Sequence, residues 1–455
     1  MVLLLYYITP RKFRNFLLLI VNLIFYGWGE PRFILLMLVS IAVNYVSGLL
    51  IGKFKNSDTP NKKAAKATLI ISIIINIGLL VFFKYAGLIG NTLKIILPFA
   101  NIPVLEIPLP IGISFYTFQT MSYTIDVYRN DAKAQKNIIT FGTYVSLFPQ
   151  LIAGPIVRYR DVETQLISRK ENINQFNNGV KLFVIGLCKK VLLANQMGAL
   201  WDILCENFTS GGVLAAWFGI CAYSLQIYFD FCGYSEMAMG LGNMLGFDFL
   251  KNFDYPYISK SITEFWRRWH ISLSTWFKEY IYIPLGGNRK GFPRQVFNML
   301  VVWALTGLWH GANYNFILWG LYFFVILFLE KLFMLKALEK IPSVFRHIYS
   351  LFLIVLGWLI FYFEDMSQLW NYLCVMFGSS GIFVSATALT DIISYLPIFA
   401  VAIFACTPVA KILYNKIPKN NFSVVADTIG CMCGLLLSTA SLASSGYNPF
   451  LYFKF

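Results

Sequence analysis

Two neighbouring stretches of the chain differ in character, because the first is strongly basic and the second is apolar. Residues 251–294 read KNFDYPYISKSITEFWRRWHISLSTWFKEYIYIPLGGNRKGFPR, and residues 300–313 read LVVWALTGLWHGAN. They hold two of the three histidines, His270 and His310, among tryptophans, whereas His347 stands alone. The first stretch has eight basic and three acidic residues, and each such charge costs about 2.5–3.5 kcal/mol at the bilayer centre. It is therefore predicted to be a cytoplasmic-side element rather than a membrane pass.

The composition of the chain indicates a polytopic membrane protein. Its 455 residues are 58% hydrophobic, 17% aromatic and 13% charged, whereas soluble domains are about 25% charged. Lys and Arg outnumber Asp and Glu by 37 to 22, but they cluster between hydrophobic runs, as the positive-inside rule describes. No nucleic-acid partner is predicted. The eight cysteines lack metal or disulfide spacing, so we expect them to serve packing, and we expect no metal site.

Hydrophobic runs recur along the whole chain. A helix needs about 20 apolar residues to cross a bilayer. The clearest runs are residues 13–28, 67–83, 180–193, 212–231, 316–329, 349–362, 389–406 and 424–442. With the less regular runs, they predict about ten to twelve spans in one transmembrane domain over residues 1–455, with re-entrant and interfacial helices. The basic runs at residues 53–66 and 267–294 are predicted to be cytoplasmic.

Two segments interrupt the succession of spans. Residues 98–110 contain four prolines and are expected to be extracytoplasmic and partly interfacial. Residues 148–161, FPQLIAGPIVRYRD, form an apolar run that is too short to cross and is stopped by Gly154 and Pro155. Irregular backbone at membrane depth must line a cavity or be buried in protein. A re-entrant hairpin or a surface loop is therefore predicted there.

The surroundings of His270 predict an amphipathic helix. Ser261 and Glu264 have the spacing of a capping box, which favours a helix start. The residues that then share one helical face are Trp266, Trp269, His270, Leu273 and Phe277. His270 is therefore predicted to point inward, and Arg267 and Arg268 to point elsewhere. Two interpretations stay open, a structural histidine that is hydrogen-bonded to a neighbour and a functional one.

His310 has a different setting, because it closes the apolar helix VFNMLVVWALTGLWH of residues 296–310. Gly311 follows directly and is predicted to supply the left-handed residue that commonly ends a helix. The partial negative charge of a helix C-terminus stabilises an imidazolium, which suits a histidine that accepts a proton. An isolated imidazole within a membrane protein is a functional candidate. The alternative is a structural histidine bonded to a backbone carbonyl.

Polar side chains also follow the apolar run that ends near residue 231. Residues 228–240 read YFDFCGYSEMAMG and include Asp230, Tyr234, Ser235 and Glu236. Such groups are costly at the end of an apolar span unless they meet partners or water. Either they line the same cavity as the histidines, or Asp230 and Glu236 only pair with nearby arginines to hold loops.

Five motifs together resemble the membrane-bound O-acyltransferase family. They are SFYTFQTMSYTIDVYR at 114–129, FPQLIAGPIVRYRD at 148–161, YFDFCGYSEMAMG at 228–240, the run from 252 to 289, and GLWHGANYNFILWG at 307–320. The resemblance covers about residues 110–320 and is closest to the alginate O-acetyltransferase branch, with teichoic-acid D-alanylation members as relatives. It implies an all-α membrane fold around a central tunnel. Family members have a longer hydrophobic N-terminus, so Met1 is expected to lie inside the first helix.

The resemblance implies roles for particular residues. The family's functional histidine, in its Trp-His-Gly motif, corresponds to His310, which would be the general base on an acceptor hydroxyl that attacks a thioester. His270 would orient the thioester or assist. The residues expected to line the tunnel are Asp230, Tyr234, Ser235, Trp269 and Trp309. The residues expected on the cytoplasmic donor or carrier side are Arg267, Arg268, Arg289 and Lys290.

Two classes of function remain. The first is an acyltransferase in the plasma or inner membrane that carries an acyl group across for O-acylation of an extracytoplasmic polysaccharide, with acetyl favoured and D-alanine the alternative. Its donor, acetyl-coenzyme A or an acyl carrier protein, would be a substrate rather than a bound cofactor. Membrane lipids and an extracytoplasmic acyltransferase resembling SGNH hydrolases are the expected partners. The second class is a transporter or scaffold, which is expected to show inverted repeats, and none is visible in the sequence.

Overall fold

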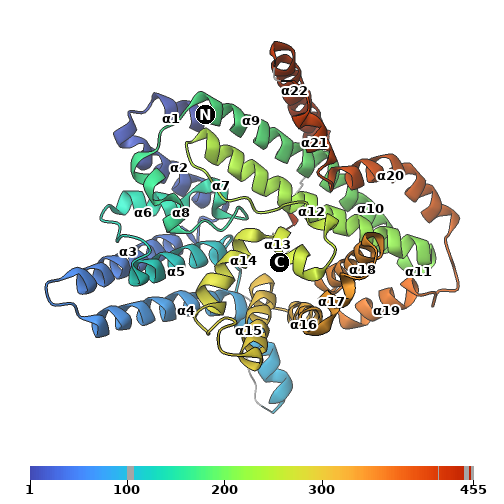
Figure 1. The fold of residues 1–455 in the computed structure, drawn as a ribbon, viewed down its shortest axis with the longest axis horizontal. Coiled ribbons are helices and arrows are strands. Elements are labelled where there is room, and N and C mark those ends of the chain that lie inside the picture. Colours follow the sequence, from blue (N-terminus) through green and yellow to red (C-terminus); the bar gives the residue numbers. More distant parts are fainter. Residues whose placement is uncertain (100–106, 419, 445–449, 452–455) are drawn as a thin grey trace. The chain divides into compact units, whose positions relative to one another are not determined.

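The protein is an all-α multi-pass membrane protein. The computed structural model describes residues 1–99, 107–418, 420–444 and 450–451, and these contain helices and no strand (Figure 1). Eight helices within these ranges are long and apolar enough to cross a membrane. The predicted fold class is therefore confirmed. Three of the four prolines of the segment 98–110 can be described, and residues 100–106, with Pro103, lie outside the described ranges.

Fewer helices qualify as spans than the ten to twelve that the sequence suggested. The eight are α3, Ile34–Asn56; α4, Lys62–Ile96; the run Ile173–Glu206; α12, Val213–Met244; Tyr314–Leu338; α18, Ser343–Tyr362; α20, Ala386–Ala405; and α22, Asn421–Ser444. Other apolar runs form helices of 16 or 17 residues, namely α2, Arg14–Gly29, and α5, Ile113–Arg129. They are shorter than the roughly 20 residues of a full crossing.

The first of two compact units consists of Met1–Phe183 and Ala238–Leu250. Besides α2 to α5 it contains α1, Val2–Ile8; α6, Ile138–Ser146; α7, Phe148–Leu151; α8, Tyr159–Ser168; and most of α9, Ile173–Cys188. Its interior holds hydrogen-bonded amides, because the side-chain amide of Asn44 donates to Asn76 at 3.1 Å and that of Asn76 donates back at 2.8 Å. These bonds join α3 to α4, as buried polar groups do between membrane helices.

The segment predicted to be re-entrant is indeed broken. The helix α6 ends at Ser146, α7 covers only four residues, and an irregular stretch leads to α8. Gln150, Leu151 and Gly154 are buried, so this irregular backbone lies within protein. This burial satisfies the condition under which non-helical backbone is tolerated at membrane depth.

The second unit consists of Val184–Met237 and Lys251–Phe455. Besides α12, α18, α20 and α22, its helices are α10, Asn195–Glu206; α11, Phe208–Gly211; α13, Ile262–Arg268; α14, Ile271–Phe277; α15, Phe292–His310; α16, Tyr314–Leu329; α17, Leu335–Leu338; α19, Met366–Met376; and α21, Val409–Asn415. Short π-helical turns cover Lys189–Ala194, Lys278–Tyr282 and Glu330–Met334. Both candidate histidines belong to this unit.

Candidate active site

The helix that leads to His270 begins as predicted. Ser261 is its N-cap, and its hydroxyl oxygen accepts a hydrogen bond from the backbone N–H of Glu264 at 3.0 Å. The carboxylate of Glu264 accepts in turn from the backbone N–H of Lys260 at 3.0 Å. The first bond satisfies a backbone donor that the start of a helix leaves unpaired, and the second ties the residue before the cap to the first turn.

The single helical face predicted for residues 266–277 is wrong. The helix α13 ends at Arg268, His270 adopts a left-handed backbone conformation with φ of 44°, and α14 starts at Ile271. A positive φ is unusual for a residue with a side chain and persists only where the surroundings hold it. The inward position of His270 is nevertheless confirmed, because its side chain is buried.

Asn252 accepts hydrogen bonds from the residues that follow this break. Its backbone carbonyl accepts from the N–H of Ile271 at 2.9 Å. Its side-chain Oδ1 accepts from the backbone N–H of Ser272 at 3.2 Å and from the Ser272 hydroxyl at 2.9 Å, and it lies 3.1 Å from Nδ1 of His270. Sequence reasoning did not single out Asn252. Its only signal was a polar residue in the motif that starts at residue 252.

Burial makes His270 a neutral imidazole. Desolvation lowers its pKa to about 3, because the interior disfavours the charged form. The ring packs edge-on against Phe231, with centroids 4.7 Å apart, and against Trp309 at 5.8 Å. Within the described part of the chain its buried Nε2 has no hydrogen-bond partner.

His310 is held by a regular helix end. It is the last residue of α15, as predicted, but Gly311 is extended (φ of −165°) and not left-handed. A glycine stands there for space, since a Cβ on Gly311 would lie 2.0 Å from the ring of Phe316. The predicted left-handed cap is therefore wrong, and close packing takes its place.

Small residues bring α15 and α16 together beside His310. A Cβ on Gly307 would lie 2.3 Å from the carbonyl oxygen of Phe316, and one on Gly320 would lie 2.5 Å from that of Trp303. Glycines at such positions let membrane helices approach closely. The imidazole of His310 then packs edge-on against Trp319, with centroids 5.0 Å apart.

A cavity of about 290 Å³ contains both histidines in its wall. Its lining residues are Thr263, Trp266, Arg267, Trp269, His270, Leu273, Ser274, Phe277, Lys278, Tyr282, Met299, Val302, Trp303, Thr306, His310 and Leu327. Arg267, Ser274 and Lys278 are exposed, whereas the histidines are buried. The described lining thus carries two cations and no carboxylate, together with aromatic rings and the two imidazoles.

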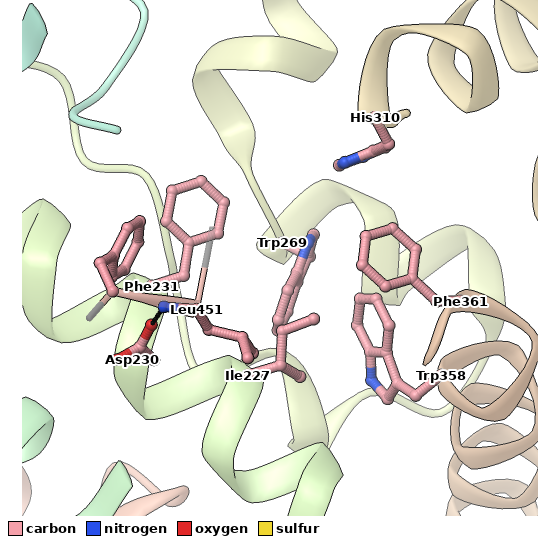
Figure 2. A pocket seen from close by; sticks show the side chains of 9 residues that line it. Ile227, Asp230, Phe231, Trp269, His310, Trp358, Phe361 and Leu451 are labelled. Carbon is pink, nitrogen blue, oxygen red and sulfur yellow. Dashed lines mark hydrogen bonds between the residues drawn. The ribbon is translucent and has the colours of Figure 1, made fainter. Parts of the chain in front are cut away.

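A second, smaller cavity of about 20 Å³ shares His310 and Trp269 with the first. Figure 2 shows the imidazole of His310 pointing into it from the end of α15, with Trp269 below. Asp230 lies on the opposite side and accepts a hydrogen bond from the backbone N–H of Leu451 at 2.7 Å (Figure 2). His310 and Trp269 are therefore the residues that belong to both cavity walls.

The polar residues near Asp230 are partly buried, and each carboxylate has a lysine partner. Asp230 pairs with Lys190, and Glu236 pairs with Lys189 at 2.5 Å, so lysines rather than the suggested arginines are the partners. Tyr234 packs on Phe450 with ring centroids 4.8 Å apart. These partners lie on the π-helical turn and near the C-terminus, which the sequence pattern gave no reason to connect.

The basic residues predicted for the donor side separate into three groups. Arg267 lines the larger cavity, and Lys278, which the prediction missed, joins it. Arg268 is occupied by ion pairs with Glu264 and Asp254 at 3.0 and 3.3 Å. Arg289 and Lys290 are exposed in the turn before α15 and are not in the wall of this cavity.

Glu330 is a buried acid that sequence reasoning also missed. Its carboxylate accepts from the backbone N–H groups of Ile262 and Thr263 at 2.7 and 2.8 Å, and from the Thr263 hydroxyl at 2.6 Å. These groups open α13, whose N-terminus favours negative charge. An acid directly after the apolar run of α16 was the available signal. Glu330 thereby fixes the helix that ends beside His270.

Ser235 and Trp309, which were also predicted to line the tunnel, are not in the wall of either cavity. Ser235 is buried on α12. Trp309 is buried between the two histidines, with ring centroids 5.8 Å from His270 and 4.9 Å from His310. Trp269 belongs to the walls of both cavities, as described above. The third histidine, His347, is apart from them and bonds the carbonyl oxygen of Ser259 at 3.2 Å.

Comparison with known proteins gives a consistent result. Residues 128–373 match the membrane-bound O-acyltransferase family. The chain is 42% identical to a probable alginate O-acetylase of Pseudomonas aeruginosa over 82% of this chain and 72% of that one, and 36% identical to its counterpart from Azotobacter vinelandii over 99% and 96%. It is 30% identical to a peptidoglycan O-acetyltransferase of Helicobacter pylori over 99% and 93%.

Proposed function

Because this chain belongs to the membrane-bound O-acyltransferase family, we propose that it transfers an acetyl group from a cytoplasmic thioester donor for O-acetylation of an extracytoplasmic polysaccharide. The acetyl group is inferred from relatives that are named alginate O-acetylase and peptidoglycan O-acetyltransferase. The observation that carries the proposal is the cavity that His270 and His310 share, with Arg267 and Lys278 at its exposed side. An apolar channel with a cationic rim suits a thioester whose arm carries a phosphate.

The chemistry follows from the position of His310. Its imidazole takes the proton of an acceptor hydroxyl while the hydroxyl oxygen attacks the thioester carbonyl. The carbon–sulfur bond then breaks, an ester forms, and the thiolate leaves and takes up a proton. The C-terminal end of α15 carries partial negative charge and stabilises the imidazolium that forms meanwhile. A general base in such a reaction contributes about 10² to 10⁴ in rate.

The two cavities support the proposed transfer across the membrane. The donor would occupy the larger one, and the acceptor would reach His310 through the smaller one. We expect the acceptor to be either the polysaccharide itself or an extracytoplasmic acyltransferase that passes the acetyl group on. His310, which belongs to both walls, would then act where donor and acceptor meet.

The donor can be tested directly. Vesicles that contain the purified chain are supplied on the outside with one of three radiolabelled donors: acetyl-coenzyme A, an acetylated carrier protein or a D-alanylated carrier protein. The release of the labelled acyl group from each donor is then measured. Release of acetyl from either acetyl donor supports the proposal. Release of D-alanine alone would assign the chain to D-alanylation. Label that crosses into the vesicle still attached to its donor would indicate a transporter.

The direction of transfer is tested by sidedness. Asn288 is exposed in the basic turn before α15, so Asn288→Cys, in a variant whose eight native cysteines are replaced, reports on that side of the membrane. An impermeant thiol reagent should label it only after the cells are opened. Labelling in intact cells would contradict a cytoplasmic donor side.

A further inference from the structure

The hydrogen bonds of Asn252 determine which nitrogen of His270 carries the proton. Oδ1 of Asn252 accepts from the backbone N–H of Ser272 at 3.2 Å. A backbone N–H can only donate, so the atom opposite it must be the amide oxygen and not the amide nitrogen. The same oxygen lies 3.1 Å from Nδ1 of His270. Nδ1 must therefore carry the proton and donate it.

This arrangement leaves Nε2 as a bare lone pair. In a neutral imidazole one nitrogen donates and the other accepts. Nε2 of His270 is buried without a hydrogen-bond partner among the described residues, and His270 lines the 290 Å³ cavity. Burying an acceptor without a partner is costly, so the fold holds this lone pair available at the place where the donor is proposed to lie.

We propose that Asn252 is a positioning residue, which holds His270 in its left-handed backbone conformation and in the Nδ1–H form so that Nε2 accepts a hydrogen bond or a proton in the donor cavity. The functional role assigned to Asn252 rests on the proposed acyl transfer, whereas the assigned tautomer of His270 does not. Asn252 reaches the backbone on the C-terminal side of the strained residue, at Ile271 and Ser272, and also reaches its side chain.

Three histidines make the tautomer measurable. In protein labelled with ¹⁵N-histidine, protonated and unprotonated ring nitrogens resonate far apart, and a His270→Gln variant assigns the His270 signals. We expect wild-type His270 to show a protonated Nδ1 and a bare Nε2 from pH 5 to 9, because its pKa is about 3. A protonated Nε2 in the wild type would overturn the proposal whether or not the chain transfers acetyl groups.

Variants of Asn252 test whether this residue sets the tautomer of His270. Asn252→Ala should let His270 shift towards the Nε2–H form, whereas Asn298→Ala should leave the signals of His270 unchanged. Asn298 is a matched control, because it is also a buried asparagine but donates to Gly287, at 2.9 Å, outside this cluster. An unchanged tautomer in Asn252→Ala would refute the assigned role. If that variant does not fold, Ser272→Ala, which keeps the backbone bond to Oδ1, should still show a protonated Nδ1.

Asn252→Asp gives a pH signature that a merely structural role would not. A carboxylate beside Nδ1–H stabilises the imidazolium and raises the pKa of His270. The rings around His270 belong to Phe231, Phe253 and Trp309, and burial alone accounts for its depressed pKa. The charged and titratable groups in the wall of the same cavity are Arg267, Lys278, Tyr282 and His310. Protonation removes the Nε2 lone pair, so acyl transfer by this variant should fall as the pH drops through the raised pKa. The wild type, measured over the same pH range, should lack this fall in rate, so a fall that appears only in Asn252→Asp is assigned to His270.

The rate of acyl transfer is the second measurement. Asn252→Ala should lower the rate at least about tenfold, since a misplacement of about 1 Å at a reacting group can cost about 10²-fold. Wild-type rates in Asn252→Ala, together with a changed tautomer, would mean that the tautomer is set by Asn252 but is not used. A wild type without any acyl transfer would instead reject the proposed function and leave the tautomer assignment standing on its spectrum.

Discussion

The two histidines share a cavity but are positioned by opposite means. His310 ends a regular helix, and glycines and aromatic rings pack that helix end in place. His270 interrupts a helix, and Asn252, which lies 18 residues before it in the sequence, accepts the hydrogen bonds that hold the interruption. Loss of one side chain from a polar network leaves its buried hydrogen-bond partners unsatisfied, which is costly. Loss of one side chain from apolar packing leaves no such unpaired group. Mutations should therefore separate the two regions.

The largest effect is expected at His310. His310→Ala should lower acyl transfer by about 10² to 10⁴, because it removes the proposed general base. Its yield and thermal stability should stay near those of the wild type, since the packing of α15 on α16 is preserved. Transfer rate and thermal unfolding of the same purified sample check this. Loss of folded protein would support the structural histidine instead.

The second prediction separates the histidines by their dependence on donor. His270 lines only the larger cavity, whereas His310 lines both. His270→Ala should raise the donor concentration needed for half-maximal transfer, and His310→Ala should remove the chemical step even at saturating donor. Rates measured against donor concentration distinguish them. An unchanged donor dependence with an equally collapsed maximal rate in both variants would mean that both histidines serve the chemical step.

The regular part of this comparison could be predicted from the sequence. Hydrophobic length and the positive-inside pattern predicted an all-α membrane protein, and the apolar run that ends at His310 predicted α15. The capping spacing at Ser261 predicted the start of α13. These features are local, because each depends on residues within a few turns of one another.

The irregular part could not be predicted, because its causes are distant in sequence. The break at His270 depends on Asn252, and the start of α13 also depends on Glu330, which lies 68 residues from Ile262. Helical spacing alone favoured one continuous helix, and the hydrogen bonds of Asn252 outweighed that preference. Likewise, Gly311 matched a common helix-ending pattern, but the ring of Phe316 is what excludes a side chain there.

The third prediction tests the packing that positions His310. Gly307→Leu should destabilise the protein by about 3 kcal/mol, because overpacking a close contact typically costs 1–3 kcal/mol and occasionally more. Gly430→Leu, on α22, is the matched control, since a Cβ there meets no atom within 4 Å. Unfolding of both variants in the same detergent gives the difference. Equal stabilities would show that α15 and α16 are not held by this contact.

The smallest effect is expected at Glu330, on the His270 side of the comparison. Its two carboxylate oxygens each accept from a backbone N–H that opens α13. Glu330→Gln keeps the shape but turns one acceptor into a donor, so one buried N–H loses its partner, at a cost of about 1–2 kcal/mol. Because α13 leads to His270 and not to His310, the variant should weaken donor use more than the maximal rate. Glu339→Gln, at an exposed position, should change neither stability nor donor dependence. A Glu330→Gln protein with wild-type stability and donor dependence would show that the α13 start does not control the geometry at His270.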